Sequence, residues 1–207
     1  MTLDPKDWPA FRQDAHAMLD AALDKLENAH SGDVWTPVPE ALKSQLDIPI
    51  PAKGATQAEI NEALKAIMPL GPGNTHPRFF GWVHGAGAPS GLISAVSEAA
   101  MNVNAGGRNH IAPVIEKQVI RWAADMVGMP RATSGLIVSG TSMATIIALK
   151  TARDQALQKS ANTPAGITKL TGYTSEQTHS CVARAFDILG LGKDNLRQIV
   201  CNSAFEI

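Results

Sequence analysis

The chain has 207 residues, of which 44% are hydrophobic and 18% charged, and its 18 lysines and arginines nearly balance its 19 acidic residues. This composition is typical of a folded globular protein and provides no basic excess that would attract nucleic acid or an anionic membrane. No apolar run approaches the roughly 20 residues that span a bilayer, and the acidic, proline-containing start is unlike a signal peptide. Two cysteines and six scattered histidines indicate neither a disulfide scaffold nor a metal site. We therefore expect a cytoplasmic protein with reduced thiols.

Residues 1–75 are expected to form a helical segment with a proline-rich connector. Apolar residues at steps of three and four predict a first helix over about residues 9–27. Four prolines between residues 30 and 54 indicate an extended connector. Thr56 and Glu59 fit a capping box at the start of a second helix.

Residues 76–207 show strands and helices in alternation. A helix is expected at residues 90–102, and Pro113 is expected at the first helical position of another. The elements predicted beyond Pro130 are a strand at 135–139, a helix at 142–158, a strand at 172–175, a helix at 178–189 and a strand at 196–201. This order predicts an α/β fold, in which a helical N-terminal segment precedes the first part of a mainly parallel sheet with helices on both faces.

The sequence GLIVSGTSMAT, from Gly135 to Thr145, is a candidate phosphate site. A predicted strand runs into Ser-Gly-Thr-Ser and a helix begins at once, which would direct backbone N–H groups and hydroxyls to one point at the positive end of the helix. The pattern matches neither GxGxxG nor GxxxxGK[ST], so it indicates neither a dinucleotide nor a nucleoside triphosphate. The alternative is that these residues only cap a helix.

A second candidate is the sequence EQTHSC, which contains His179 and follows the strand predicted around Tyr173. Ligands of α/β proteins collect at the carboxyl ends of parallel strands. The alternative is a histidine at a helix terminus, satisfied by a backbone carbonyl. A further loop carries Arg108 and His110, to which the sequence assigns no role.

Four segments in order resemble the pyridoxal-phosphate-dependent decarboxylases of the aromatic amino acid and glutamate decarboxylase group. They are HPRFFGWV (76–83), the E-x-x-V-I-R-W segment (116–122), GLIVSGTSMATIIALKTAR (135–153) and YTSEQTHSCVARA (173–185). The resemblance covers about residues 76–201 and, more weakly, the opening helices. It implies that residues 76–207 are the first part of an aspartate-aminotransferase-like large domain, that the cofactor is pyridoxal 5′-phosphate and that the substrate is an L-amino acid.

The resemblance also assigns roles to individual residues. Gly140, Thr141 and Ser142 match the loop that wraps the cofactor phosphate. His179 matches the histidine that stacks on the pyridine ring near the substrate carboxylate, where its nitrogens can donate a hydrogen bond or relay a proton. No metal ligand is implied.

The substrate pocket is implied at Phe80, Trp82 and His84. Here the sequence departs from the animal aromatic amino acid decarboxylases, which resemble Tyr-Phe-Pro-Thr where this chain has Trp-Val-His-Gly at residues 82–85. The resemblance therefore leaves open which amino acid is the substrate.

The family's Schiff-base lysine and its aspartate for the pyridinium nitrogen have no match among these residues. Both are expected beyond Cys201, so the 207 residues are expected to be the N-terminal portion of a larger carboxy-lyase and to be inactive alone. They would be a truncated gene product, an expressed portion or one piece of a split enzyme. The alternatives are a non-catalytic binding or dimerisation module and a related aldehyde-forming or carbon–carbon lyase.

The apolar stripes of the first two helices suggest an assembly. The connector between them is too rich in proline for a large shared core, and so much exposed apolar surface is unusual in a monomer. The resemblance implies a homodimer in which residues 1–75 wrap around the partner. The rival is that this segment folds back on its own sheet.

Overall fold

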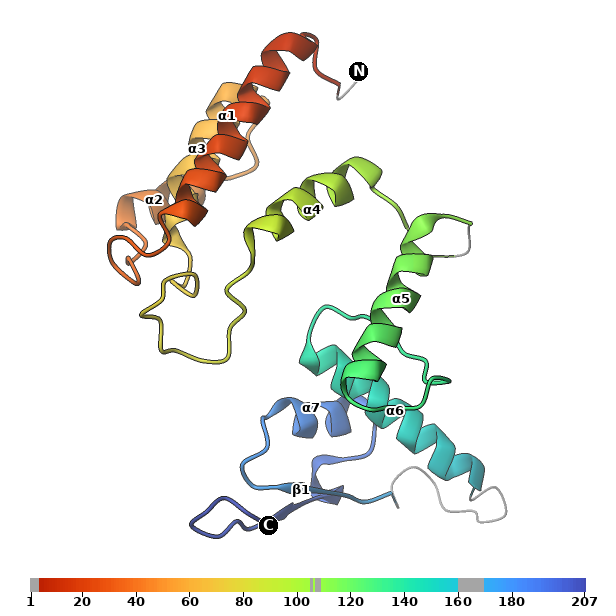
Figure 1. The fold of residues 1–207 in the computed structure, drawn as a ribbon. Helices are drawn as coiled ribbons and strands as arrows, with labels where there is room; N and C mark the ends of the chain where they lie inside the picture. The colour runs from red at the N-terminus through yellow and green to blue at the C-terminus, as the bar shows by residue number, and fades with distance from the viewer. Residues whose placement is uncertain (1–3, 105, 107–108, 160–169) are drawn as a thin grey trace. The chain divides into compact units, whose positions relative to one another are not determined.

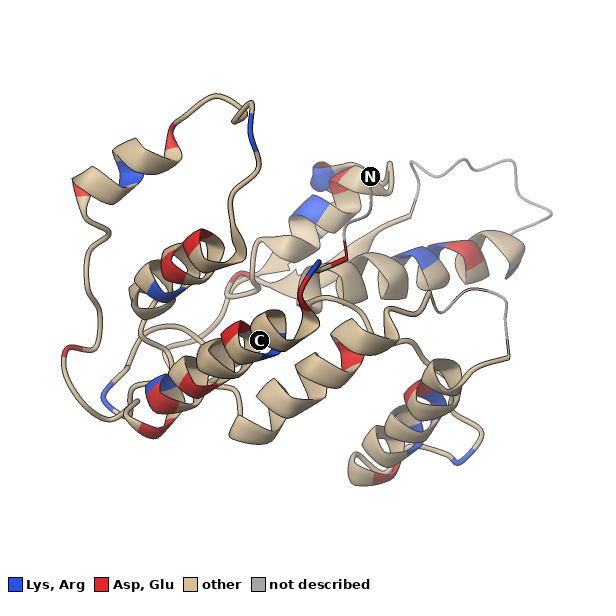
Figure 2. Ribbon diagram, turned by 90° about the horizontal axis from the view of Figure 1, so that it is seen from above, with Lys and Arg blue, Asp and Glu red and all other residues tan. Residues whose placement is uncertain are grey.

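The computed structural model describes residues 4–104, 106, 109–159 and 170–207 (Figure 1). The chain divides into two compact units, Met1–Asn104 and Ala105–Ile207. In the described part of the chain, no helix combines the length and the apolar character needed to cross a membrane. In the ribbon of Figure 2, positions of Lys and Arg are interspersed with positions of Asp and Glu along the helices.

The first unit contains the two helices that periodicity predicted. Helix α1 spans Trp8–Glu27 and begins after Asp7, whose Oδ1 accepts the N–H of Ala10 at 3.0 Å. Helix α3 spans Gln57–Ile67 and begins with the predicted capping box. In that box the Glu59 carboxylate accepts the backbone N–H of Thr56 at 2.7 Å, while Thr56 Oγ1 accepts the N–H of Glu59 at 3.3 Å. The two hydrogen bonds that Thr56 donates to this carboxylate lower the pKa of Glu59.

A third helix, α2, spans Glu40–Leu46, where an extended connector was expected. That expectation was wrong because Pro39 precedes this helix instead of interrupting it. Its φ of −60° suits the residue before a first helical turn, where no N–H is needed. Lys43 and Glu40 form an ion pair of 2.6 Å one turn apart on the helix.

Helices α1 and α3 lie side by side (Figure 1). The buried Asn61 joins them, since its side-chain amide donates to the carbonyl of Asp14 at 3.2 Å. Apolar side chains of both helices nevertheless stay accessible in this chain, including Trp8, which is 54% exposed, and Ile60 and Leu64 on α3. The unit continues with a 3₁₀ turn at Met68–Leu70 and helix α4, Pro89–Met101, which ends at a left-handed Asn102.

The second unit contains a parallel strand pair and the helices around it. Helix α5 spans Ile111–Met126, α6 spans Thr141–Lys159, β1 spans Gly172–Ser175, α7 spans Cys181–Ile188 and β2 spans Leu196–Ile199, preceded by a 3₁₀ turn at Lys193–Asn195. Strands β1 and β2 run parallel in the register Gly172 with Leu196 to Ser175 with Ile199, which confirms that these two predicted strands belong to a parallel sheet. The crossover between them contains α7, as in other parallel pairs.

The strand predicted at residues 135–139 is not present. This segment has no ladder partner among the described residues, and Leu136 and Ile137 are exposed instead of buried. The N–H of Ile137 donates to Glu116 Oε1 at 3.0 Å, so a side chain of α5 takes the place of a neighbouring strand. Three boundaries differ from the expected ones by two residues or more. Helix α5 begins at Ile111, two residues before Pro113, turns at residues 176–180 delay α7 to Cys181, and β2 ends at Ile199.

The core of the second unit lies where α7 covers β1. Ala185, Phe186 and Leu191 are buried, and the ring of Phe186 lies directly over Gly172. A Cβ at Gly172 would come within 2.3 Å of Phe186 Cζ.

Gly172→Ala is therefore expected to lower the free energy of unfolding by about 1–3 kcal/mol, the usual cost of overpacking a core. Urea denaturation measures this change. Gly135→Ala is the matched control, since a Cβ there meets Ile120 Cγ2 at an ordinary 3.5 Å. Equal stability of the two variants would contradict the close packing of Phe186 on β1.

Candidate functional site

The start of α6 and the turn before α7 meet at a cavity of about 550 Å³. The cavity is lined by residues from both segments: Ser139, Gly140, Thr141, Ser142, Met143, Ile146, His179 and Cys181. The structure thus brings together the two candidate sites, which lie 31 or more positions apart in the sequence. All four residues expected to contact the cofactor are among the lining residues.

The backbone at the start of α6 presents hydrogen-bond donors to this cavity. The carbonyl of Gly140 accepts the N–H of Ala144 at 3.1 Å, the first bond of the helix. The preceding N–H groups, of residues 141–143, have no acceptor among the described residues. Gly140 has a φ of +151°, which residues with a Cβ rarely adopt. Glycine is therefore needed for the backbone turn that leads into the helix.

The electrostatics of the cavity favour an anion. The three hydroxyls of Ser139, Thr141 and Ser142 lie beside the positive end of a 19-residue helix. Neither the cavity lining nor the first turn of α6 contains an acidic residue. Backbone N–H groups and hydroxyls at a helix start are a donor set that fits a phosphate group.

His179 lies exposed at the cavity, and its Nδ1 accepts the backbone N–H of Cys181 at 3.2 Å. A nitrogen that accepts carries no proton, so this hydrogen bond assigns the proton of the neutral ring to Nε2. The alternative reading of the sequence, a histidine donating to a backbone carbonyl, does not describe this hydrogen bond. The ring is fixed at Nδ1 and has a donor available at Nε2.

The cavity contains lining residues that the sequence analysis did not single out. Cys181 is a buried free thiol whose Sγ lies 3.9 Å from Thr145 Oγ1. Met143 and Ile146 contribute apolar surface from α6. Ile146 lies four residues after Ser142 and three after Met143, and this spacing is the available signal, because helix residues three or four apart share one face.

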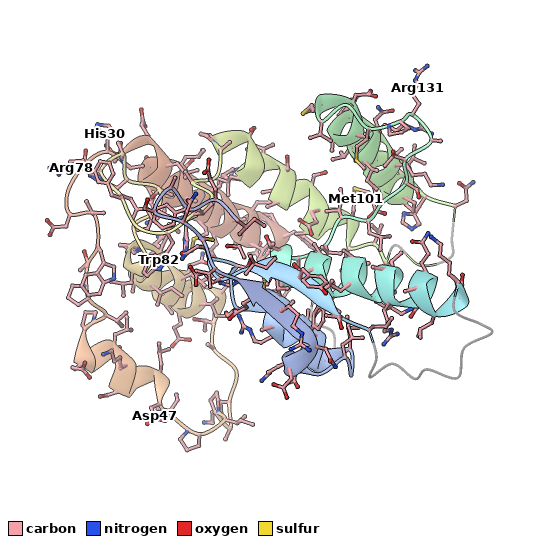
Figure 3. All side chains as sticks on the ribbon, turned by 90° about the horizontal axis from the view of Figure 1, so that it is seen from below. His30, Asp47, Arg78, Trp82, Met101 and Arg131 are labelled. Atoms are coloured by element: carbon pink, nitrogen blue, oxygen red, sulfur yellow. The ribbon has the colours of Figure 1, made fainter. Side chains whose placement is uncertain are left out.

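The expected substrate-pocket residues belong to the first unit. Trp82, labelled in Figure 3, has its ring centroid 5.7 Å from that of His84. Phe79 completes the group, 6.4 Å from Trp82 and 5.9 Å from His84. Phe80 is 93% exposed and makes no recorded ring contact among the described residues. Of the two neighbouring phenylalanines, Phe79 therefore joins this aromatic cluster.

The sequence analysis also named Arg108 and His110, without assigning them a role. Arg108 lies outside the described residues, and His110 precedes the first turn of α5. Among the residues that the structure describes, no three histidine, cysteine or acidic side chains are grouped to hold a metal ion.

Comparison with known proteins identifies the family. Residues 39–207 match the pyridoxal-dependent decarboxylase conserved domain. Tryptophan decarboxylase 2 of Oryza sativa subsp. japonica is 28% identical over 99% of this chain and 43% of its own length. The aromatic-L-amino-acid decarboxylase of Bacillus atrophaeus is 30% identical over 87% of this chain and 37% of its own. The chain thus spans about two fifths of the length of these curated relatives.

Solved structures agree with this family. Oryza sativa TDC with PLP and tryptamine superimposes with a TM-score of 0.81 at 24% identity, covering 98% of this chain and 44% of the other. Mouse CSAD gives 0.81 at 22% identity, covering 97% and 43%. These likenesses confirm the expected fold, that of the large domain of aminotransferase-like enzymes, over the part that the chain spans. The chain belongs to the pyridoxal-dependent decarboxylase family, and pyridoxal phosphate, the cofactor expected from the sequence, is the cofactor of that family.

Proposed function

We propose that this chain contributes the phosphate-binding loop and the ring-stacking histidine of a decarboxylase that acts on an L-amino acid. The observation that supports this proposal most is the shared cavity, which joins the start of α6 to His179. Relatives named as tryptophan, tyrosine and cysteine sulfinic acid decarboxylases support an amino acid as the substrate.

Phosphate binding is assigned to Gly140, Thr141 and Ser142. The glycine lets the chain turn into α6, and the two following residues offer backbone N–H groups and hydroxyls at the positive helix end. Charge-assisted hydrogen bonds of this kind hold a phosphate without a lysine. Met143 and Ile146 would exclude water beside it.

His179 is assigned to the cofactor ring and the substrate carboxylate. When bound, pyridoxal phosphate supplies an electron-poor ring that takes up the electron pair left behind as carbon dioxide departs. The face of the imidazole suits stacking on such a ring, and its Nε2–H can donate to the carboxylate and orient it. Delivery of a proton from a doubly protonated ring would require Nδ1 to give up its bond from the Cys181 N–H.

The covalent attachment of the cofactor is assigned to another part of the enzyme. No lysine lines the cavity among the described residues. We infer that the 207 residues alone bind the cofactor by its phosphate and do not turn over. Turnover experiments therefore use the complete enzyme. By complete enzyme we mean these residues together with the part of the relatives that this chain does not cover.

The test supplies the complete enzyme with pyridoxal phosphate and L-amino acids that have aromatic or acidic side chains. Carbon dioxide and the corresponding amine are measured, and equal amounts of both are expected with at least one substrate. Aldehyde in place of amine would favour the carbon–carbon lyase or aldehyde-forming alternative. Cofactor binding without release of carbon dioxide from any substrate would favour a binding module and contradict the proposal.

We also propose a homodimer in which residues 1–75 cross to the partner. The support is the accessible apolar surface of α1 and α3, including Trp8, Ile60 and Leu64, within a unit whose own core is small. A two-fold contact would bury this surface on both copies at once.

Deleting residues 1–55 from the complete enzyme is expected to raise the dimer dissociation constant at least tenfold, because it removes α1 and α2. Sedimentation equilibrium measures that constant. Ile60→Glu with Leu64→Glu, which retains all three helices and charges one exposed face of α3, is expected to act in the same direction. Unchanged dimer affinity in both variants would favour the rival, in which the segment packs on its own sheet.

A further inference from the structure

The turn that carries His179 is tied to the end of β2 by Glu176. Strand pairing ends at Ser175 and Ile199. One residue later, the backbone N–H of Glu176 donates to the carbonyl of Ile199 at 3.0 Å, and Glu176 Oε1 accepts the N–H of Cys201 at 3.0 Å. The side chain thus makes the next contact between the two chain segments after the ladder has ended.

Further hydrogen bonds join the residues on either side of Glu176 in this turn. Ser175 Oγ accepts the N–H of Gln177 and lies 3.0 Å from Cys201 Sγ. The N–H of Thr178 donates to the carbonyl of Ser175 at 3.0 Å, and the Thr178 hydroxyl contacts that of Thr174. The turn between β1 and His179 is therefore closed on itself and fastened to the residues after β2.

The acidic side chain of Glu176 lies outside the cavity. It is not among the lining residues, whereas His179, three positions later, is. A hydrogen bond from a backbone N–H to a carboxylate is stronger than one to a neutral acceptor. The carboxylate of Glu176 therefore holds the turn firmly against the residues after β2. The role open to Glu176 is consequently to hold the turn, without contact to the cofactor or the substrate.

We propose that Glu176 is a positioning residue, whose hydrogen bond to the Cys201 N–H fixes the turn that presents His179 to the cavity. This inference rests on the proposed function, since it gives the histidine a task in turnover. Without the carboxylate, the N–H of Cys201 loses its acceptor and one of the ties between the turn and β2 is removed. The ring of His179 would then sample several orientations at the cavity.

The first test is hydrogen exchange in the complete enzyme, followed in peptides that contain Cys181 or Cys201. Glu176→Ala is expected to speed exchange at both amides at least fivefold, because one donates to Glu176 and the other to His179. Glu176→Gln keeps an accepting oxygen and is expected to stay within twofold of wild type. Asp194→Ala, an exposed acid in the turn before β2, is the control. Faster exchange at Cys201 alone would overturn the link to His179.

The second test is a double-mutant cycle on kcat. Glu176→Ala is expected to lower kcat about tenfold in the wild-type background and less than twofold in the His179→Ala background, since residues that act through one another are not additive. Glu176→Gln is expected to restore turnover to within threefold of wild type.

Equal losses in the two backgrounds, or a loss in Glu176→Gln as large as in Glu176→Ala, would overturn the positioning role. The two proposals fail differently. Wild-type turnover of His179→Ala, together with faster exchange at both amides in Glu176→Ala, would overturn the function proposed for the histidine and support the structural tie.

Discussion

His179→Ala in the complete enzyme is expected to lower kcat by on the order of 100-fold or more while leaving the fold intact. The side chain is exposed at the cavity and is held by a single hydrogen bond from the Cys181 N–H, so its removal takes away little buried surface. Its loss would remove the stacking face and the Nε2 donor from the reacting centre. Steady-state kinetics measures kcat, and the urea midpoint reports the fold.

The control for this experiment is His16→Ala, which removes an exposed histidine from α1 and is expected to leave kcat unchanged. His179→Gln separates two contributions, since its amide can donate a hydrogen bond but lacks the aromatic face. It is expected to recover only part of the lost rate. Wild-type turnover in His179→Ala would reduce this residue to a structural part of the turn before α7.

Replacing both Thr141 and Ser142 by alanine is expected to weaken binding of pyridoxal phosphate more than either single change. Each hydroxyl that bonds a charged group contributes about 1–2 kcal/mol, which corresponds to roughly 5- to 30-fold in the dissociation constant. The backbone N–H groups of α6 remain in the variant, so binding should be reduced and not abolished. Titration followed by absorbance or fluorescence gives the constants.

The affinity for pyridoxal, which lacks the phosphate, shows whether the weaker binding is due to lost contacts with the phosphate. The variants should bind pyridoxal as wild type does, because the affected donors face the phosphate. Thr151→Ala is the matched control, since Thr151 lies on the same helix with its hydroxyl donating to the carbonyl of Ile147, away from the cavity. Unchanged affinity for pyridoxal phosphate in Thr141→Ala and Ser142→Ala alike would reject the phosphate-binding role.

Local signals in the sequence predicted most of the helices and the two strands that form β1 and β2. The capping box at Thr56 is an example, because its two reciprocal bonds lie within one helical turn and need no tertiary contact. Helix α2 was missed because a proline can start a helix as well as end one, and only the geometry at Pro39 distinguishes the two.

Features that depend on distant partners were predicted less well. The segment before α6 has the composition of a buried strand, but a strand needs a neighbour, and here Glu116 is the partner of Ile137. The sequence likewise could not show that His179 accepts from the Cys181 N–H, since that depends on the turn conformation. Phe79 and Phe80 are adjacent phenylalanines, so the sequence could not show that Phe79 joins the aromatic cluster while Phe80 is exposed.

The sequence predicted more of the cofactor site than of the assembly. Gly140, Thr141, Ser142 and His179 were named from two short segments, and the structure places all four at one cavity. Their roles, the homodimer and the cytoplasmic location remain predictions.

A crystal structure of the complete enzyme with pyridoxal phosphate gives the most direct test of the proposed cofactor site. The cofactor phosphate is expected within hydrogen-bonding distance, about 2.7–3.2 Å, of the backbone N–H groups of residues 141 and 142. The His179 ring is expected to stack on the pyridine ring. A phosphate bound elsewhere, with the start of α6 facing solvent or another protein segment, would contradict the proposed site.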